Sequence, residues 1–367
     1  MSARTDATTP VTASPAATIP TLVLGGTGYV AGEFLRLLTG HPNLTLAAAV
    51  SGSRAGEPVA ATFPQLGAAY GDAAFVGPDD VPALLQRHEE LAVFSAAPHG
   101  ASAPMLAQLL VDAESAGSRL HIVDASADFR FPARAAFEAV YGQDHGAPEL
   151  FDAFRCAVPE QRAATDTDHA AHPGCFATSV LLGAVPLLAA GLIHPTVFVA
   201  GITGSTGSGR SPTATTHHPE RHSNLFAYKP LAHRHAPEIA ALSEAATGVA
   251  ANFSFIPHSG PFARGIHSTL QAPLAAGADR DALAAALTDY YRDSPFVRIV
   301  DGTPRVKDVA GSNYAHIGVA ADGSTAAVFV VIDNLLKGAA GGAMQWMNRL
   351  WSLPETAGLT QPAPGWI

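Results

Sequence analysis

A glycine-rich turn between a strand and a helix constrains the fold of this chain more than any other feature. The apolar run Thr21–Leu24 leads into GGTGYVAG at residues 25–32, and a helical pattern follows over Glu33–Leu38. The turn contains GxGxxA, a spacing that allows a tight turn, close approach of the backbone to a pyrophosphate, and close packing of helix on strand. A second apolar run, Leu44–Val50, follows at the distance typical of a βαβ unit. The sequence therefore predicts a dinucleotide-binding domain, with a simple glycine-rich turn as the alternative.

The end of the second strand bears on which dinucleotide is bound. An NAD site usually has Asp or Glu there to hold the ribose 2′-hydroxyl, whereas this chain has SGSR at residues 51–54. Hydroxyls and a guanidinium suit a 2′-phosphate, so NADP is favoured over NAD, unless Arg54 is only a solvated surface charge. The predicted cofactor ligands in this region are Gly25, Gly26, Thr27, Gly28, Tyr29, Val30, Ser51, Ser53 and Arg54.

The remaining apolar runs predict two domains. Leu91–Ala96 and His121–Asp124 continue the alternation of strand and helix typical of a doubly wound α/β fold. Beyond residue 175 four more strands are predicted in a mixed sheet, at Thr196–Ile202, Asn252–Ile256, Ile266–Ala272 and Thr325–Ile332. We expect a disordered tail over 1–20, a Rossmann-like NADP-binding domain over 21–174, and an α+β substrate and dimerisation domain over 175–333. A final helix, at about 334–352, is expected to return to the first domain.

The run HPGCFATS at residues 172–179 puts one of only two cysteines at the start of an apolar helical stretch, Val180–Leu192. A thiol at a helix N-terminus lies near unpaired N–H groups and the positive end of the helix dipole, which favour the thiolate. Cys175 is therefore a candidate nucleophile, although burial as a small apolar side chain is equally common for a free cysteine. The other cysteine, Cys156, lies in an apolar run and is expected to be buried.

The loop GSTGSGR, at residues 204–210, is predicted to bind an anion. Consecutive backbone N–H groups can form an anion nest, and Arg210 can add a bidentate contact. The loop also approaches the P-loop pattern GxxxxGKS, with arginine in place of the lysine. A P-loop nucleotide triphosphatase is therefore a distant alternative, and a mobile surface loop is another.

Two histidines and an arginine crowd the start of a further predicted helix, Ile239–Ala246. Because histidine titrates near neutral pH, His233 or His235 could move a proton while Arg234 or Arg264 holds an anionic substrate. A hydrated basic turn is the alternative. A metal site is disfavoured, because Pro219 interrupts the histidine spacing nearby and no carboxylate or thiol completes a ligand set.

Composition excludes several classes of protein. The 367 residues carry a formal charge of -10 without acidic or basic blocks, which argues against binding to nucleic acid or an anionic membrane. Two cysteines cannot form a disulfide framework, so a reducing cytoplasm is expected. The first 20 residues lack the apolar core of a signal peptide, and no run reaches the roughly 18 apolar residues of a membrane span.

Beyond residue 20 the chain resembles the N-acetyl-gamma-glutamyl-phosphate reductases of the semialdehyde dehydrogenase superfamily. HPGC and HRHxPEI are the specific markers, whereas the glycine turn is shared with unrelated dehydrogenases. Departures are modest, such as Ala97 before Pro98 and a less aromatic stretch at 143–144, and none touches the expected chemistry. The segments that carry the resemblance are GGTGYVAG, APHGAS from Ala97, DASADFR from Asp124, HPGCFAT from His172, GSTGSGR from Gly204, AHRHAPEI from Ala232, and DNLLKGAAGGAMQ from Asp333.

The resemblance implies NADPH-dependent reduction of N-acetylglutamyl 5-phosphate to the 5-semialdehyde, a step of arginine biosynthesis, by a homo-oligomer. Cys175 would attack the acyl phosphate, expel phosphate and form a thioester, and His233, or failing that His235, would manage the proton. It adds Pro98, Ser205, Gly207 and Asn334 to the cofactor ligands, and it implies as substrate ligands Arg130, Arg210, His233, Glu238 and Arg264.

Several other functions stay open from the sequence. Aspartate-semialdehyde dehydrogenase shares the mechanism, but the HRHxPEI segment argues against it. A reductase of a carrier-bound aminoadipyl phosphate would keep every catalytic part and change only the pocket. A thiol hydrolase would keep Cys175 but leave the glycine turn without a role.

Overall fold

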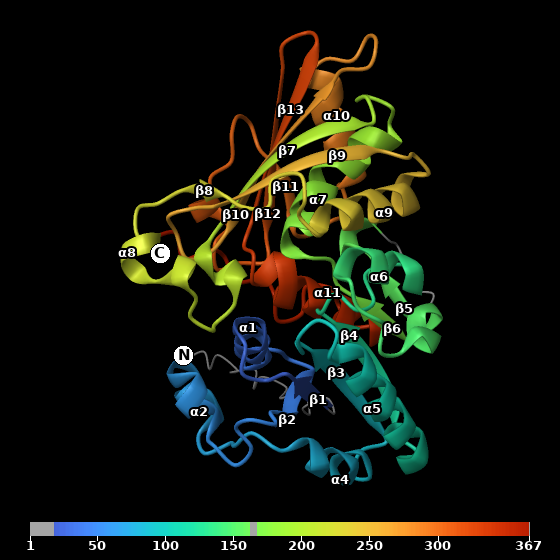
Figure 1. Ribbon diagram of the computed structural model, residues 1–367, viewed down its shortest axis with the longest axis vertical. Helices are drawn as coiled ribbons and strands as arrows, with labels where there is room; N and C mark the ends of the chain where they lie inside the picture. The colour runs from blue at the N-terminus through green and yellow to red at the C-terminus, as the bar shows by residue number, and fades with distance from the viewer. Residues whose placement is uncertain (1–17, 162–166, 367) are drawn as a thin grey trace, which may run out of the picture.

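The chain folds around two β-sheets, one parallel and one mixed, seen in the lower and upper parts of Figure 1. The computed structural model describes residues 18–161 and 167–366. Most of the predicted tail therefore lies outside the described residues, and the first strand begins at Ile19, two residues before the predicted start. The predicted α/β fold class, a doubly wound domain joined to a domain with a mixed sheet, is confirmed.

The first sheet has six parallel strands in the order β2-β1-β3-β4-β6-β5. Its central strands read ELAVFS and RLHIVD, near-continuous apolar runs of the kind found where both faces of a parallel sheet are covered. Neighbouring side chains of β1 alternate accordingly, since Val23 and Leu22 belong to cores on opposite faces. The strands are β1 Ile19–Leu24, β2 Leu44–Ala49, β3 Glu90–Ser95, β4 Arg119–Asp124, β5 Phe154–Cys156 and β6 His169–Ala171.

Helices cover both faces of this sheet. On one face α1 buries Phe34, whose ring stacks on Phe94 of β3 with the ring centroids 3.9 Å apart. On the other face α5 buries Leu106 and Leu109. The helices of this part of the chain are α1 Tyr29–Leu38, α2 Val59–Thr62, α3 Gly67–Tyr70, α4 Val81–Leu85, α5 Ser102–Ala116 and α6 Arg134–Tyr141.

The second sheet has seven strands in the order β11-β12-β13-β10-β7-β9-β8 and mixes parallel with antiparallel pairs. All four strands predicted for it are present. Strands β8, β11 and β12 were not predicted from the sequence. The first two are only two and three residues long, and β12 reads AHIGVAA, which is poor in large apolar residues. The strands are β7 Thr196–Thr203, β8 Phe226–Ala227, β9 Asn252–Ser259, β10 Ile266–Pro273, β11 Val297–Ile299, β12 Ala315–Ala321 and β13 Thr325–Ile332.

The central helix α7, Cys175–Ala189, packs against the second sheet and is buried on all sides from Phe176 to Leu188. Such a helix has no polar face and must be enclosed by other elements, here α9 (His235–Thr247), α10 (Arg280–Tyr290) and the strands. The short helix α8, His218–Arg221, lies apart from this core.

After β13 the chain returns to the first sheet. It forms a π-helical turn over Leu336–Ala340 and then α11, Gly341–Leu350, which lies beside β4 in Figure 1. Met344 and Trp346 of α11 are fully buried in the same core as Phe34 of α1. The chain therefore passes between the sheets twice, once before α7 and once after β13.

Candidate active site

Cys175 is the first residue of α7, as the sequence predicts, although the helix begins five residues before the predicted apolar stretch. Gly174 caps the helix in an extended conformation, with φ −61° and ψ 154°. Its carbonyl accepts the N–H of Thr178 at 2.8 Å, and its own N–H donates to Oε1 of Glu238 at 2.6 Å. The turn before the thiol is therefore held by α9 of the same domain.

A cavity of about 340 Å³ brings Cys175 together with both predicted histidines. Lys229 and Arg234 line it as well, so the thiol shares the cavity with two cationic side chains from the segment before α9. Such a setting suits an anionic ligand. The remaining lining residues are Phe176, Thr203, Gly207, Ser208, Thr215, Phe226, Tyr228 and Ser259.

Burial raises the pKa of the Cys175 thiol to about 11, while Arg130 acts in the opposite direction. The helix N-terminus alone predicts a lowered pKa for this thiol, and this expectation is wrong. The reason is that desolvation disfavours the thiolate more than the dipole and the guanidinium favour it. The thiol therefore needs a base before it can act as a nucleophile at neutral pH.

The two histidines differ in which nitrogen can accept a proton. Nδ1 of His233 accepts the backbone N–H of His235 at 3.2 Å, which places the proton of neutral His233 on Nε2. His235 has no such constraint, because its buried Nδ1 has no hydrogen-bond partner among the described residues. Its Nε2 lies against Gly174, where a Cβ atom would be only 2.4 Å away. His235 is thus the histidine that can present an unprotonated nitrogen beside the thiol-bearing turn.

Burial lowers the pKa of both imidazoles. Desolvation, helped by Arg234 and Lys229, lowers the pKa of His233 to about 4. Burial, His233 and Arg130 hold the pKa of His235 well below its ordinary value. Both rings are therefore neutral at physiological pH, as a proton acceptor must be.

Arg130 and Glu238, both predicted substrate ligands, form an ion pair behind the turn. The guanidinium lies 3.5 Å from Oε2 of Glu238 and also donates to the carbonyls of His172 and Ala125. Glu238 is fully buried. Neither residue lines the cavity around Cys175. The ion pair holds the turn in place, and its two charges act in opposite directions on the pKa of Cys175.

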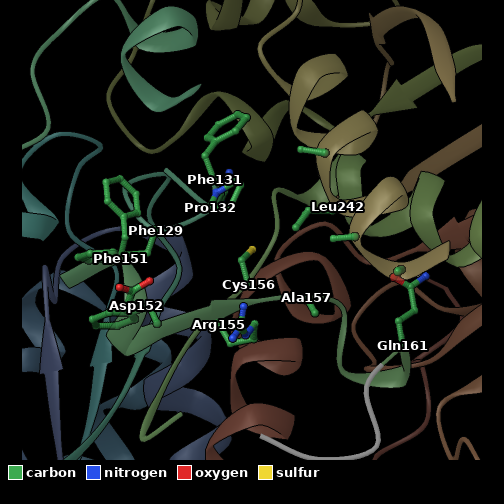
Figure 2. Close-up of a pocket in the computed structure, with 15 residues that line it drawn as sticks. Phe129, Phe131, Pro132, Phe151, Asp152, Arg155, Cys156, Ala157, Gln161 and Leu242 are labelled. Atoms are coloured by element: carbon green, nitrogen blue, oxygen red, sulfur yellow. The ribbon is translucent and has the colours of Figure 1, made fainter. Parts of the chain in front are cut away.

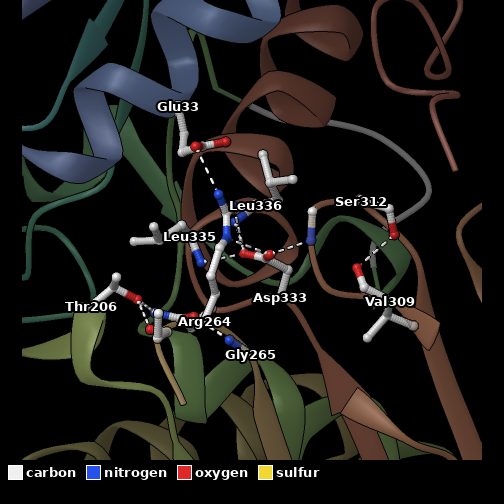
Figure 3. Close-up of polar contacts among 12 residues, drawn as sticks. Glu33, Thr206, Arg264, Gly265, Val309, Ser312, Asp333, Leu335 and Leu336 are labelled. Atoms are coloured by element: carbon white, nitrogen blue, oxygen red, sulfur yellow. Dashed lines mark hydrogen bonds and ion pairs between the residues drawn. The ribbon is translucent and has the colours of Figure 1, made fainter. Parts of the chain in front are cut away.

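Arg264, also predicted to bind the substrate, has a different environment. Figure 3 shows its guanidinium between Asp333 and Glu33, with the closest N–O distance 2.9 Å to each carboxylate. It does not line the cavity around Cys175, so the assignment of Arg264 as a substrate ligand is not supported. Because Glu33 lies on α1 and Asp333 directly after β13, the arginine joins the two parts of the chain.

Asn334, predicted near the nicotinamide, is also buried at this junction. Its Oδ1 accepts the N–H of Gly265 at 2.7 Å, and its Nδ2 donates to Oγ1 of Thr206 at 3.0 Å. It thereby holds the loop that contains Ser205 and Gly207, of which Gly207 reaches the Cys175 cavity.

The anion nest predicted for residues 204–210 is wrong for most of the loop. The N–H groups of Ser205, Thr206, Gly207 and Gly209 each donate to a backbone carbonyl and are not free for an anion. Only a short 3-10 turn, Ser205–Ser208, follows the strand, whereas a P-loop leads into a helix. The loop geometry therefore contradicts the nucleotide triphosphatase alternative.

Arg210 was predicted to bind the substrate carboxylate or phosphate. In the structure its side chain contacts the first domain. It donates to the carbonyls of Thr27 and Thr62, at 3.3 and 3.0 Å, and lies over the ring of Phe63. The side chain therefore covers the glycine turn and is not among the residues that line the Cys175 cavity.

A second cavity, of about 410 Å³, lies at the glycine turn and has the features of a dinucleotide site. Gly25 has φ +68°, and a Cβ there would be 2.7 Å from the backbone of Ala96, so only glycine fits. The first turn of α1 has no side-chain cap, which leaves backbone N–H groups for a pyrophosphate. Predicted ligands that line this cavity are Gly25, Thr27, Ser51, Ser53 and Pro98.

Not every predicted cofactor ligand reaches this cavity. Gly26 donates its N–H to Val50, and Gly28 caps α1 with Tyr29 and Val30 in the first turn. Arg54 is half exposed and pairs with Glu57 at 2.7 Å.

A third cavity, of about 450 Å³, lies between α9 and the β5 region (Figure 2). Cys156 lines it and is partly exposed, so the prediction of a simply buried cysteine is wrong. Burial nevertheless raises the pKa of this thiol well above its ordinary value. Cys156 therefore stays a thiol.

The structure adds residues that the sequence analysis did not single out. Lys229, Tyr228, Thr203 and Ser259 line the Cys175 cavity from three separate segments. Lys229 has φ +44°, a backbone conformation that lysine rarely adopts and that the sequence does not predict. Across residues 18–161 and 167–366, no three metal-ligating side chains gather and no helix is long and apolar enough to cross a membrane.

Comparison with known proteins agrees with this geometry. Residues 21–153 match the family model for the semialdehyde dehydrogenase NAD binding domain, and residues 175–334 match that for the semialdehyde dehydrogenase dimerisation domain. An N-acetyl-gamma-glutamyl-phosphate reductase of Desulforudis audaxviator is 39% identical over 93% of this chain and 97% of its own. One of Methanosarcina barkeri is 38% identical over 93% and 98%. The chain belongs to the N-acetyl-gamma-glutamyl-phosphate reductase family.

It is accordingly an oxidoreductase of amino-acid biosynthesis with a nicotinamide-cofactor domain. Solved structures show the same fold at much lower identity. Aspartate semialdehyde dehydrogenase II of Vibrio cholerae superposes with a TM-score of 0.65 at 15% identity, covering 92% of this chain and 99% of its own. The Candida albicans enzyme, solved with NADP, gives 0.61 at 15% identity over 92% and 99%.

Proposed function

We propose that this enzyme reduces N-acetylglutamyl 5-phosphate to N-acetylglutamate 5-semialdehyde through a thioester on Cys175, with NADPH as reductant. The observation that carries the proposal is the single cavity in which a helix-terminal thiol, two neutral histidines and two cations meet. Relatives that bear this reductase name match almost the whole chain.

The chemistry begins with removal of the thiol proton. With its pKa near 11, Cys175 is protonated at neutral pH, and Nε2 of His235 is the acceptor that the hydrogen bonds leave free. The sulfur then attacks the acyl carbon, the C–O bond to phosphate breaks, and phosphate leaves as the thioester forms. Lys229 and Arg234 stabilise the charge on the phosphoryl group and on the substrate carboxylate.

The cofactor, when bound at the glycine turn, supplies a hydride to the thioester carbon. His233 carries its proton on Nε2 and is placed to donate a hydrogen bond to the oxygen of the tetrahedral adduct. Breaking the C–S bond of that adduct releases the aldehyde and leaves Cys175 as a thiolate, which takes back a proton through His235.

The preference for NADP rests on the end of β2. Ser51 and Ser53 line the dinucleotide cavity, and the strand end carries no carboxylate to hold a 2′-hydroxyl or repel a 2′-phosphate. Arg54 lies one residue further, and the N–H groups of its guanidinium other than the one that pairs with Glu57 would complete a phosphate site.

The two parts of the chain divide this work. We assign dinucleotide binding to residues 21–174 together with the returning segment 334–352, and the thiol helix and the subunit contact to residues 175–333. A homo-oligomer follows from the dimerisation domain that the second part matches. We place the contact on the face of the mixed sheet opposite α7, where Phe198 is 53% and Ile256 36% exposed.

The test is an assay in the reverse direction with N-acetylglutamate semialdehyde, phosphate and NADP, and with aspartate semialdehyde as the matched control. NADPH formation that requires phosphate and the acetylated substrate supports the proposal. Equal activity on aspartate semialdehyde, or none on either, would refute the assigned substrate. The second result would favour a carrier-bound acyl phosphate instead.

A further inference from the structure

The two segments that pass between the sheets pack directly against each other, and Cys175 lies at their crossing. The first is the turn HPGC at residues 172–175, between β6 and α7. The second is the π-helical turn Leu336–Ala340 with the start of α11. π-helical turns are rare and are often found at functional sites.

Gly338 lies against the thiol-bearing residue. A Cβ atom at this position would be 2.7 Å from Cβ and 3.0 Å from Cα of Cys175. Carbon atoms in contact lie at about 3.5–4.0 Å, so any side chain here requires a shift of about 1 Å.

Gly342 makes the corresponding contact with the start of the turn. A Cβ atom there would be 2.1 Å from Cε1 of His172. The His172 ring is fully buried, and its Nε2 donates to the carbonyl of Lys337 at 3.1 Å. The two ends of the HPGC turn, His172 and Cys175, therefore each pack against a glycine of the returning segment.

The returning segment, which is the π-helical turn with the start of α11, is held in place by hydrogen bonds and an ion pair. Oδ1 of Asp333 accepts the N–H groups of Leu335 and Leu336, at 2.8 and 3.0 Å, where the π-helical turn begins. The buried ammonium of Lys337 pairs with Glu160, which is also fully buried. A side chain added at residue 338 would therefore displace Cys175 in part.

We propose that Gly338 and Gly342 are positioning residues for Cys175, holding the thiol at the depth from which it reaches the acyl carbon. The inference rests on the proposed function, since it assumes that the thiol is the nucleophile. The two glycines then determine the position of the thiol and do not contribute to dinucleotide binding.

The variant that tests it is Gly338→Ala. A displacement of about 1 Å lowers turnover by about 100-fold, so kcat in the reverse assay is expected to fall by that factor. The Kd for NADP is expected to stay near its wild-type value, because Gly338 does not line the dinucleotide cavity. Gly341→Ala is the matched control: its Cβ would be 2.3 Å from Oδ1 of Asn313, so it crowds the same segment away from Cys175.

A second measurement does not depend on activity. Melting temperatures of wild type, Gly338→Ala, Cys175→Gly and the double variant form a cycle that reports the contact between the two positions. We expect the double variant to melt at a higher temperature than Gly338→Ala, because removing the cysteine Cβ relieves the clash. If Gly338→Ala does not fold, recovery of a folded double variant supports the contact, and failure of both variants counts against it.

Three results would overturn the proposal: wild-type kcat in Gly338→Ala, an equal loss of kcat in Gly341→Ala, or additive changes in melting temperature. A wild-type protein without turnover would refute the proposed function but not the contact, which the melting temperatures decide separately.

Discussion

Glu238→Gln is expected to destabilise the protein while making the catalytic thiol more acidic. Glu238 is fully buried, and its carboxylate lies 3.5 Å from the Arg130 guanidinium. At an effective dielectric constant near 20, that distance corresponds to about 5 kcal/mol of attraction. Removing one partner of a buried pair typically costs about 3–5 kcal/mol, because the other charge stays buried and unpaired. We therefore expect the free energy of unfolding to fall by about 4 kcal/mol.

The glutamine keeps an oxygen that accepts the Gly174 N–H, so the turn before Cys175 retains its hydrogen bond. Glu238→Ala removes that acceptor too and is expected to lose a further 1–3 kcal/mol or so. Urea denaturation measures both. Glu90→Gln is the control, because Glu90 forms an ion pair with Arg119 that is largely exposed, and such pairs contribute below about 1 kcal/mol.

The thiol gives the second readout of the same variant. Burial raises the pKa of Cys175 to about 11, Arg130 lowers it, and Glu238 raises it further. Without the carboxylate, the guanidinium acts unopposed, so the pKa falls and alkylation by iodoacetamide at a fixed neutral pH becomes faster. An unchanged unfolding free energy, or slower alkylation, would refute the account of this ion pair.

Three further predictions concern the nucleophile, the cofactor and acid stability. Cys175→Ser should abolish turnover but leave NADP binding, measured by fluorescence titration, nearly intact; retained turnover would rule out the covalent route. Arg54→Ala should weaken NADP more than NAD, and equal weakening would show that Arg54 never meets the 2′-phosphate. Burial lowers the pKa of His172 to about 3 from 6.5, so its neutral form stabilises the fold above pH 6.5 and that stability is lost as the pH falls toward 3. The loss of unfolding free energy between about pH 7 and about pH 5 should be smaller in His172→Asn, and an equal loss would contradict it.

Local patterns allowed much of the fold to be predicted. The glycine turn, strands β1 to β4 of the first sheet and the helix that begins at Cys175 depend on residues close together in sequence, so their spacing was informative. The short strands β5, β6, β8 and β11 were not predicted, because pairing with a neighbour, and not their own composition, makes them strands.

Long-range contacts explain the failures at the site. Arg264 is a reasonable anion ligand from sequence, but its partners Glu33 and Asp333 come from opposite ends of the chain. The N–H groups of the 204–210 loop bond to the distant carbonyls of Phe262 and Ala263 as well as to each other. The direction of the Cys175 pKa was also missed, because burial depends on the packing of the whole second domain.

The choice between the two histidines illustrates the same limit. The sequence places both in HRH and favours His233 only by resemblance. The hydrogen bond from the His235 backbone to Nδ1 of His233 distinguishes them, and it depends on how the helix α9 begins. This single backbone contact is the reason why we propose His235, and not His233, as the base.

The most direct test of the central claim is to trap the thioester by leaving out phosphate. With N-acetylglutamate semialdehyde and NADP alone, the account predicts about one NADPH per active site and an N-acetylglutamyl adduct on the peptide that contains Cys175. Added phosphate should then remove the adduct and restore turnover. NADPH formation without any adduct on Cys175, or an adduct that persists in Cys175→Ser, would contradict the account.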